Sequence, residues 1–434
     1  MPMTFNVTTK LSKETGTGKA DHMQPIYIEG GTCLIDEVFS ETSLTLAEGK
    51  IVAIGQKCPR DALTLYAQGK YVLPGIIDIH GDTFERQIMP RPNVRFPIDM
   101  ALIDTDIQLA ANGITTAYHG VTLSWEPGLR SVEAGKQFAQ ALNEIRPQLK
   151  IDNRIQVRWE TFAFEAIETV MEWMASDVPP AIAFNDHTSS TIRKLAGKRI
   201  TKLREWAARC GLNEQDYLEL MNDVWERRDE VQDNIRKVAD AGKVSDCAML
   251  SHDDENLRDR QMFRNAGVRI SEFPMCLEAA RDAKMHKEHI VLGAPNVVRG
   301  GSHNGSLNAA DCIENGLCTI LASDYYYPSM PAAIFKLVED KKLSLEKAWA
   351  LISQNPADAL RLADRGRLCE GMRADVILVD VFRTKPVDIA ATIAHGKIAC
   401  LKDHRLFASP GNHTGRNFIA VPPPRHSAAA DKPW

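Results

Sequence analysis

The sequence predicts an α/β fold: a (β/α)8 TIM barrel that carries a small β-sandwich built from both ends of the chain. A long middle region alternates β-like and helical segments, which is the pattern of parallel βα units. Short β-type segments, separated by glycines and polar residues, occur at both ends. The 434 residues are enough for one large barrel and a small accessory domain.

The barrel is predicted to occupy residues 71–365, where eight candidate strands recur. They are 72–80, 113–121, 154–160, 180–186, 246–251, 267–272, 289–294 and 318–323. Eight such units close into a (β/α)8 barrel. The stretch 189–240 is too long for a plain connection and places Leu, Lys, Arg and Glu at helical spacing, so we expect a helical excursion over the barrel mouth.

The β-sandwich is predicted to combine residues 25–70 with 366–407, because neither segment can bury a good core alone. A hairpin is expected to turn at His395-Gly396. Residues 1–24 are polar and predict a flexible lead. Residues 408–434 are rich in proline and predict a tail that is loose or packed on a neighbour.

Composition excludes several classes of protein. The hydrophobic fraction of 44% and charged fraction of 25% are typical of a soluble globular protein. A net charge of −5 without a long basic run argues against nucleic acid as a partner. No apolar stretch reaches the roughly 18 residues of a membrane span, and no secretory signal is evident. Because the nine cysteines are scattered, we expect reduced thiols and a cytoplasmic location.

The candidate active site follows from where polar residues end the predicted strands. In barrel enzymes the active site lies at the carboxyl ends of the strands. The first strand ends in His80 and Asp82, whose side chains share one face because they are two residues apart. Each such residue alone could cap a turn, but imidazole and carboxylate groups recur at other strand ends. These are Glu160, Asp186, His187, His252, Asp253, Asp254, Glu272, His303 and Asp324.

This set predicts a site for two divalent metal ions. His80, Asp82 and Asp324 would hold one ion, His187 and His252 the other, and Glu160 would bridge them. A bridging water would ionise near neutral pH, and Asp324 is expected to orient the hydroxide and accept its proton. Asp253 or Asp186 would accept a hydrogen bond from a ligand histidine. Zinc, manganese and iron all suit such ligands.

Basic residues in the loops after the strands predict an anionic substrate. Arg86 and Arg91 lie in a proline-bracketed loop, and Arg299 lies in a glycine-rich loop over 294–305. Arginine forks and backbone N–H groups in such loops bind phosphate. Arg95 also lies in a loop that follows a strand end. For this residue a surface salt bridge is at least as good an interpretation as phosphate binding.

Several motifs identify a family. The segments Leu73–His80, Gly113–Thr116, Asn355–Leu360 and Gly371–Val376 resemble the amidohydrolase superfamily, and the resemblance spans about residues 25–407. The superfamily resemblance implies a metal-dependent hydrolase built on a barrel of amidohydrolase type with a β-sandwich.

Further blocks resemble the M-protein family of phosphonate metabolism. They are Met89–Pro92, Asn185–His187, Ser251–Asp254, Glu272–Pro274, Gly293–His303 and Ser323–Tyr326. That family hydrolyses α-D-ribose 1-methylphosphonate 5-triphosphate and releases pyrophosphate in the carbon–phosphorus lyase pathway. The resemblance implies a phosphorylated small-molecule substrate, attack of a metal hydroxide on the α-phosphorus, and neutralisation of the triphosphate by Arg86, Arg299 and His303. The resemblance does not decide whether the protein is a homo-oligomer, and it points to proteins of that pathway as partners.

One segment departs from the family pattern. After His187 the chain reads Thr188–Lys194, where the family carries a Ser-Pro-Gly-Gln-Arg-Gln type segment. Arg193 or Lys194 could replace the arginine. The alternative to a diphosphatase is therefore an amidohydrolase or deaminase that cleaves a C–N bond of a cyclic amide, or an enzyme for another phosphorylated small molecule. A non-catalytic protein on this scaffold is disfavoured because none of the ligand positions is missing.

Overall fold

The computed structural model describes residues 24–91, 94–196, 203–301, 307–380 and 387–409. The predicted lead over 1–24 and tail over 408–434 lie outside the described residues, except at Gln24, Ala408 and Ser409. His303 also lies outside them.

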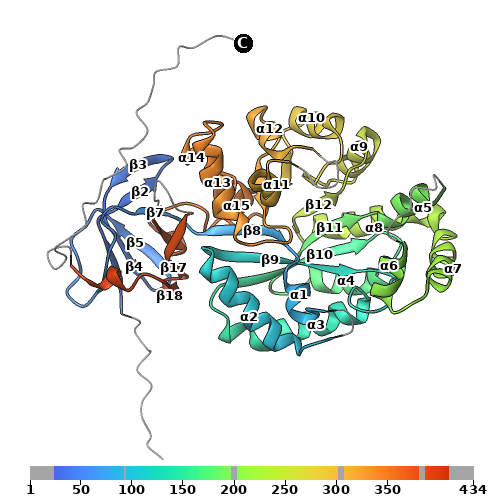
Figure 1. Cartoon of the computed structure of the whole chain (residues 1–434), viewed down its shortest axis with the longest axis horizontal. Coiled ribbons are helices and arrows are strands. Elements are labelled where there is room, and N and C mark those ends of the chain that lie inside the picture. The colour runs from blue at the N-terminus through green and yellow to red at the C-terminus, as the bar shows by residue number, and fades with distance from the viewer. Residues whose placement is uncertain (1–23, 92–93, 197–202, 302–306, 381–386, 410–434) are drawn as a thin grey trace, which may run out of the picture.

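A parallel sheet of eight strands forms the centre of the molecule (Figure 1), and its strands are neighbours in sequence order. They are β8 (Ile76–Gly81), β9 (Ile114–Leu123), β10 (Asp152–Glu160), β11 (Ala181–Asn185), β12 (Met249–His252), β13 (Ile270–Glu272), β14 (His289–Gly293) and β15 (Ile320–Ala322). The chain after β15 closes the sheet on β8: Asp324 N donates to His80 O at 3.0 Å, and Asp82 N donates to Asp324 O at 2.9 Å. The predicted barrel is confirmed.

Helices follow the strands and cover the outside of the barrel. Those of the first half are α1 (Phe84–Ile88), α2 (Ile98–Ala111), α3 (Val132–Ile145), η1 (Arg146–Gln148), η2 (Phe164–Ala166), α4 (Ile167–Met174) and α8 (Val231–Val244). Those of the second half are α9 (Leu257–Asn265), α10 (Leu277–Met285), α11 (Ala294–Arg299), α12 (Ala309–Glu314), α13 (Ser329–Glu339), α14 (Leu345–Ala350) and α15 (Gln354–Ala359).

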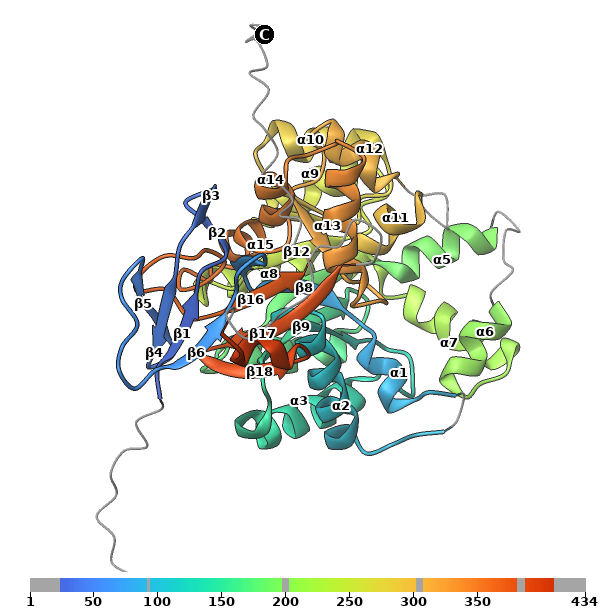
Figure 2. The same cartoon turned by 60° about the vertical axis from the view of Figure 1, so that its left-hand side comes forward.

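Three additional helices stand between β11 and β12, where the helical excursion was predicted. They are α5 (His187–Ala196), α6 (Leu203–Cys210) and α7 (Glu214–Trp225), and the turn η3 (Arg228–Glu230) leads from them to α8. Figures 1 and 2 show these helices together on the side of the molecule opposite the β-sandwich. Tyr217 and Met221 of α7 pack on Ala207 and Cys210 of α6 in a small apolar cluster of their own.

Two sheets near the chain ends form the accessory domain (Figure 2). The strand order is β5-β4-β1-β6 in the first sheet and β18-β17-β16-β7-β2-β3 in the second. The strands are β1 (Ile26–Glu29), β2 (Thr32–Ile35), β3 (Val38–Glu41), β4 (Leu44–Ala47), β5 (Lys50–Ile54), β6 (Leu63–Tyr66), β7 (Tyr71–Pro74), β16 (Val376–Asp380), β17 (Asp388–Ala394) and β18 (Lys397–Leu401), followed by the turn η4 (His404–Phe407). His395 and Gly396, with φ of 48° and 72°, make the expected hairpin turn between β17 and β18.

The predicted strand 72–80 is wrong as a single element. It divides at Gly75 into β7, which pairs with β2 and β16 in the accessory domain, and β8 of the barrel. A Cβ on Gly75 would come within 2.2 Å of Thr115 Oγ1, so only glycine allows the chain to pass from one sheet to the other here.

Strand β10 shows how the barrel positions polar groups. Val157 and Trp159 point outward and are buried in the apolar layer between the sheet and its helices. Because side chains alternate along a strand, Gln156, Arg158 and Glu160 point to the opposite face, the inside of the barrel. Among the described residues, no helix is both long and apolar enough to cross a membrane.

Candidate active site

Three groups of potential metal ligands meet at the carboxyl ends of the barrel strands. In each group the ligand atoms lie within 4.8 Å of one another. The groups are His80, Asp82 and Asp324; His187, His252 and Asp253; and His80, His252 and Glu272. We call these seven residues the ligand cluster. His80 and His252 connect the groups, and their rings are stacked with centroids 5.4 Å apart.

Glu272 orients both central histidines. Its carboxylate accepts a hydrogen bond of 2.7 Å from His252 Nδ1, and it lies 3.1 Å from His80 Nδ1 in an ion pair. His80 Nδ1 is nevertheless a buried atom without a hydrogen bond to any described residue. Gln156 helps to fix the carboxylate, because its Nε2 donates to Glu272 Oε1 at 2.7 Å. A carboxylate in this position selects the tautomer of the histidines and makes their ring nitrogens better ligands.

Arg158 lies in the middle of the ligand cluster. It is only 6% exposed, donates to His252 Nε2 at 3.1 Å, and approaches Asp82 to 3.9 Å. Gly120 on the neighbouring strand makes room for it, since a Cβ there would lie 3.1 Å from Arg158 Cδ. A permanently charged guanidinium at this point can neutralise negative charge on a substrate.

The pKa values reflect the crowding of like and unlike charges. Burial raises the pKa of Asp324 to about 6, with Asp82 adding to the rise and His80 opposing it. Desolvation opposes protonation of His187, but Asp253 and Glu160 outweigh it and raise its pKa to about 9. Burial and nearby Arg158 lower the pKa of His252. Strongly shifted carboxylates and imidazoles gathered in one cleft are typical of a functional site.

The structure brings most of the predicted ligands together. His80, Asp82 and Asp324 form one group, and His187 and His252 belong to another, with Asp253 as its third member. Glu160 joins no such group of described residues. Its carboxylate accepts from the backbone N–H groups of His187 and Thr188, both at 3.2 Å, and from the Thr188 hydroxyl at 2.8 Å.

The predicted substrate-binding arginines are dispersed. Arg299 lines a cavity of about 280 Å³ together with Arg158 and ligand-cluster residues, and it donates to the Tyr325 hydroxyl at 3.3 Å. Arg86 and Arg91 are exposed and are not part of this wall. Arg86 lies on helix α1 and not in a loop as predicted, and Arg91 follows that helix. The direction of these side chains depends on helix packing, which the sequence position does not fix.

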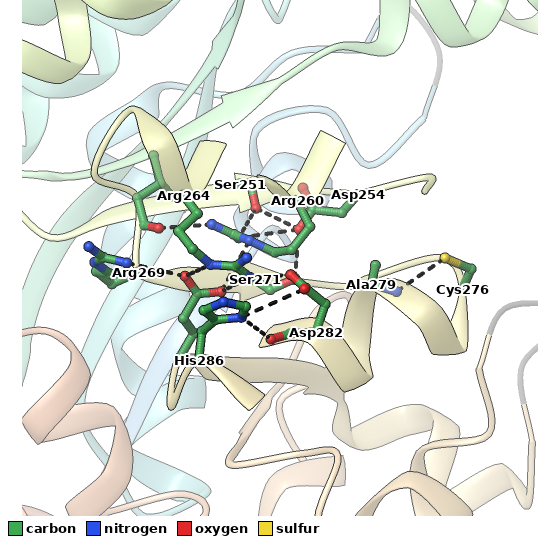
Figure 3. Close-up of polar contacts among 12 residues, drawn as sticks. Ser251, Asp254, Arg260, Arg264, Arg269, Ser271, Cys276, Ala279, Asp282 and His286 are labelled. Carbon is green, nitrogen blue, oxygen red and sulfur yellow. Dashed lines mark hydrogen bonds and ion pairs between the residues drawn. The ribbon is translucent and has the colours of Figure 1, made fainter. Parts of the chain in front are cut away.

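A second cluster of buried charge lies behind β12 and β13 (Figure 3). Asp254 accepts from Ser251 at 2.8 Å, from Ser271 at 2.7 Å and from Arg260 at 3.3 Å. Arg260 is fully buried and also pairs with Glu288 at 3.2 Å. Arg264, Arg269 and Asp282 complete what we call the arginine network through ion pairs with Glu288 and between Arg264 and Asp282. This network fixes the chain that follows His252, where Asp253 adopts a φ of 58°.

Sequence reasoning missed two residues of the site. Arg158 has no predicted role, and Glu272 is predicted only as one of the carboxylates at strand ends. In the second half of β10, Gln156, Arg158 and Glu160 alternate with the apolar residues Ile155, Val157 and Trp159. This alternation was a usable signal, because it marks three polar side chains on one buried face.

Comparisons with known proteins agree with this geometry. A sequence profile of the amidohydrolase family matches residues 198–400. α-D-ribose 1-methylphosphonate 5-triphosphate diphosphatase of Escherichia coli (strain K12) is 30% identical over 345 residues, covering 77% of this chain and 90% of the relative. The structure of molinate hydrolase has a TM-score of 0.59 at 14% identity, covering 94% of this chain and 100% of that one. Dihydropyrimidinase from Brevibacillus agri NCHU1002 has a TM-score of 0.53 at 14% identity, covering 88% and 96%.

The chain therefore belongs to the amidohydrolase superfamily, and within it to the family of the phosphonate-pathway diphosphatase. The predicted family is confirmed. The two solved structures, at 14% identity, support the barrel fold alone.

Proposed function

We propose that the protein hydrolyses the triphosphate of α-D-ribose 1-methylphosphonate 5-triphosphate, or of a close relative, and releases pyrophosphate. The observation that carries the proposal is the presence of Arg158 and Arg299 in the same cavity wall as the metal-ligand groups. A neutral cyclic amide would not need two guanidinium groups there, whereas a polyphosphate does. The name of the Escherichia coli relative supports the same substrate class.

The ligand cluster fits divalent metal ions. It offers histidine and carboxylate donors at ligand spacing, and His80 Nδ1 is buried without a hydrogen bond. We propose two ions, one held by His80, Asp82 and Asp324 and the other by His187, His252 and Asp253. When bound, such ions lower the pKa of a coordinated water and neutralise charge on phosphate oxygens. Zinc, manganese and iron all suit these donors.

The protein's own groups would divide the remaining work. Asp324, whose carboxylate has its pKa raised to about 6 by burial, accepts the proton of the attacking water. Arg158 and Arg299 bind the phosphate oxygens and hold the α-phosphorus in line for attack. The bond between the α-phosphorus and the bridging oxygen breaks, and pyrophosphate leaves with that oxygen.

One assay tests the proposal directly. The purified protein is analysed for bound metal and then incubated with ribosyl phosphonate triphosphate, nucleoside triphosphates and cyclic amides. We expect pyrophosphate from the first and no ring opening of the last. Ring opening of a cyclic amide without pyrophosphate release would instead support a C–N hydrolase, and a metal content well below one ion per chain would contradict both.

We also propose a cytoplasmic location. All nine cysteines are free in the structure, as expected in a reducing compartment. The proposed partner is the phosphorylated small molecule.

A further inference from the structure

A second cavity lies on the other side of Arg158 from the metal-ligand cavity. It has a volume of about 230 Å³ and is bounded by the ends of β9 and β10 and by helices α5–α7. We infer that this cavity, the arginine cavity, binds the pyrophosphoryl end of the substrate, while the sugar and its phosphonate occupy the metal-ligand cavity. The inference rests on the proposed function, since it divides that substrate between two cavities.

Neither cavity alone is large enough for the whole substrate. Pockets for small molecules usually measure about 300–1,000 Å³. The metal-ligand cavity, at about 280 Å³, and the arginine cavity, at about 230 Å³, each fall short of that range, whereas together they lie within it. Arg158 lines both, so a substrate that spans them passes beside its guanidinium.

The two cavities offer different kinds of positive charge. The wall of the arginine cavity contains four cations, Arg130, Arg158, Lys194 and Arg209, against the two carboxylates Glu126 and Glu160. In the metal-ligand cavity the carboxylates Asp82, Asp253 and Asp324 would hold the proposed ions, and the α-phosphorus has to lie beside those ions to be attacked. The phosphates beyond the α-phosphorus then need cations of their own, which the arginine cavity supplies.

The cations of this cavity keep donors for a ligand. Arg130 uses Nε and Nη2 on Glu85, at 3.1 and 3.0 Å, and Arg209 uses Nη2 on Glu126, at 2.8 and 2.6 Å. Nη1 of each makes no hydrogen bond with a described residue, although a guanidinium has five N–H donors. Lys194 has no carboxylate within 4.0 Å among the described residues, unlike Arg193, which pairs with Glu255 at 2.5 Å.

Helices α5–α7 also make the wall rigid. Trp125 Nε1 donates to the Thr188 hydroxyl at 2.9 Å, and the Tyr217 hydroxyl donates to Glu126 at 2.8 Å, so the aromatic side chains connect the barrel to the additional helices. Hydrogen-bond donors that are already fixed in place lose little conformational entropy when they bind a polyanion. The inference thus gives the helical excursion a role: it completes the binding site for the leaving group.

Titration of the metal-loaded full chain with inorganic pyrophosphate tests the inference. Lys194→Met should weaken binding about tenfold, the loss expected for one charged hydrogen bond. Arg193→Met is the matched control, since it removes a neighbouring exposed cation that pairs with Glu255 and does not line the cavity. Arg209→Met should weaken binding further, with a melting curve measured to show that the variant is folded. Arg299→Met should weaken pyrophosphate binding less than Lys194→Met does, because Arg299 lines only the metal-ligand cavity.

The outcomes separate this inference from the proposed function. Absence of pyrophosphate binding to the unaltered protein, or equal affinity in the Lys194 and Arg209 variants, overturns the inference even if triphosphate hydrolysis is observed. Loss of affinity only in Arg299→Met would place pyrophosphate in the metal-ligand cavity and also overturn it. If pyrophosphate binding depends on Lys194 but no triphosphate is hydrolysed, the arginine cavity is still a pyrophosphate-binding site and the proposed function is rejected.

Discussion

Two buried clusters of charge lie side by side on β12, and they differ in balance. In the arginine network, the buried Arg260, the largely buried Arg264 and the exposed Arg269 face Asp254, Asp282 and Glu288, so its charges neutralise one another. In the ligand cluster, Asp82, Asp253, Glu272 and Asp324 face a single guanidinium, Arg158. Buried charge of one sign is costly unless it is compensated.

The difference separates structural from functional charge. A balanced network needs nothing from outside the chain and can fix the backbone around it. An unbalanced cluster of carboxylates and imidazoles has an affinity for cations that the chain does not satisfy. The adjacent residues Asp253 and Asp254 belong to different clusters. A substitution of Asp253 should therefore affect metal binding, and a substitution of Asp254 should affect the stability of the fold.

The largest effect is expected from Asp324→Asn, which removes both a ligand and the proposed proton acceptor. Loss of a general base lowers rates by about 10²–10⁴-fold. Pyrophosphate release from the triphosphate substrate should fall by at least that factor, and bound metal should decrease as well. A variant with full metal content and unchanged kcat would remove Asp324 from the mechanism.

The comparison is tested most directly by Asp253→Asn and Asp254→Asn, two isosteric changes at adjacent positions. Asp254→Asn removes one of the two buried carboxylates that pair with Arg260 and leaves Glu288 as the other. Breaking a buried ion pair costs up to about 3–5 kcal/mol of unfolding free energy. Asp253→Asn should instead lower metal content from about two ions to about one, without destabilising the metal-free protein. Urea unfolding and metal analysis measure both; equal destabilisation by the two changes would contradict the distinction.

Much of this fold could be predicted from the sequence because barrels place active sites at strand ends. The strand-end rule alone selected His80, Asp82 and Asp324, which the structure brings together. The division at Gly75 could not be predicted, since it depends on the contact with Thr115 in another strand. Local sequence shows an apolar run and does not show which sheet each half joins.

The arginine network and the arginine cavity were beyond sequence reasoning for a related reason. Arg260 and Arg209 are on helices whose packing decides which side chains face the barrel. Position after a strand favoured Arg86, yet its side chain is exposed. Sequence order gives the position of a charge along the chain, whereas its function depends on what else is buried around it.

A third buried polar site provides a pH test that involves neither cluster. His119 is buried against Phe84 and Phe138 and hydrogen-bonds Asn153 Oδ1 at 2.8 Å. Burial lowers its pKa to about 4, only partly opposed by that hydrogen bond. The unfolded chain therefore binds the proton more tightly than the folded protein does. The contribution of neutral His119 to the free energy of unfolding should be fully present above pH 6.5 and should fall by about 3 kcal/mol as the pH decreases towards 4. In metal-free protein, His119→Gln should reduce this dependence; identical pH profiles would exclude His119 as its source.

The smallest effect is expected from Glu160→Gln, which distinguishes a bridging ligand from a helix-capping carboxylate. In the structure the two carboxylate oxygens of Glu160 accept hydrogen bonds from the first residues of α5, and the single carbonyl oxygen of glutamine can still accept those from Thr188. Loss of the negative charge at a helix N-terminus costs about 0.3–1 kcal/mol. Metal content should remain that of the unaltered protein, because Glu160 joins none of the ligand groups of described residues. Loss of a metal ion from this variant would show that Glu160 is itself a metal ligand. The uncompensated carboxylates of the ligand cluster would then lie on both sides of Arg158.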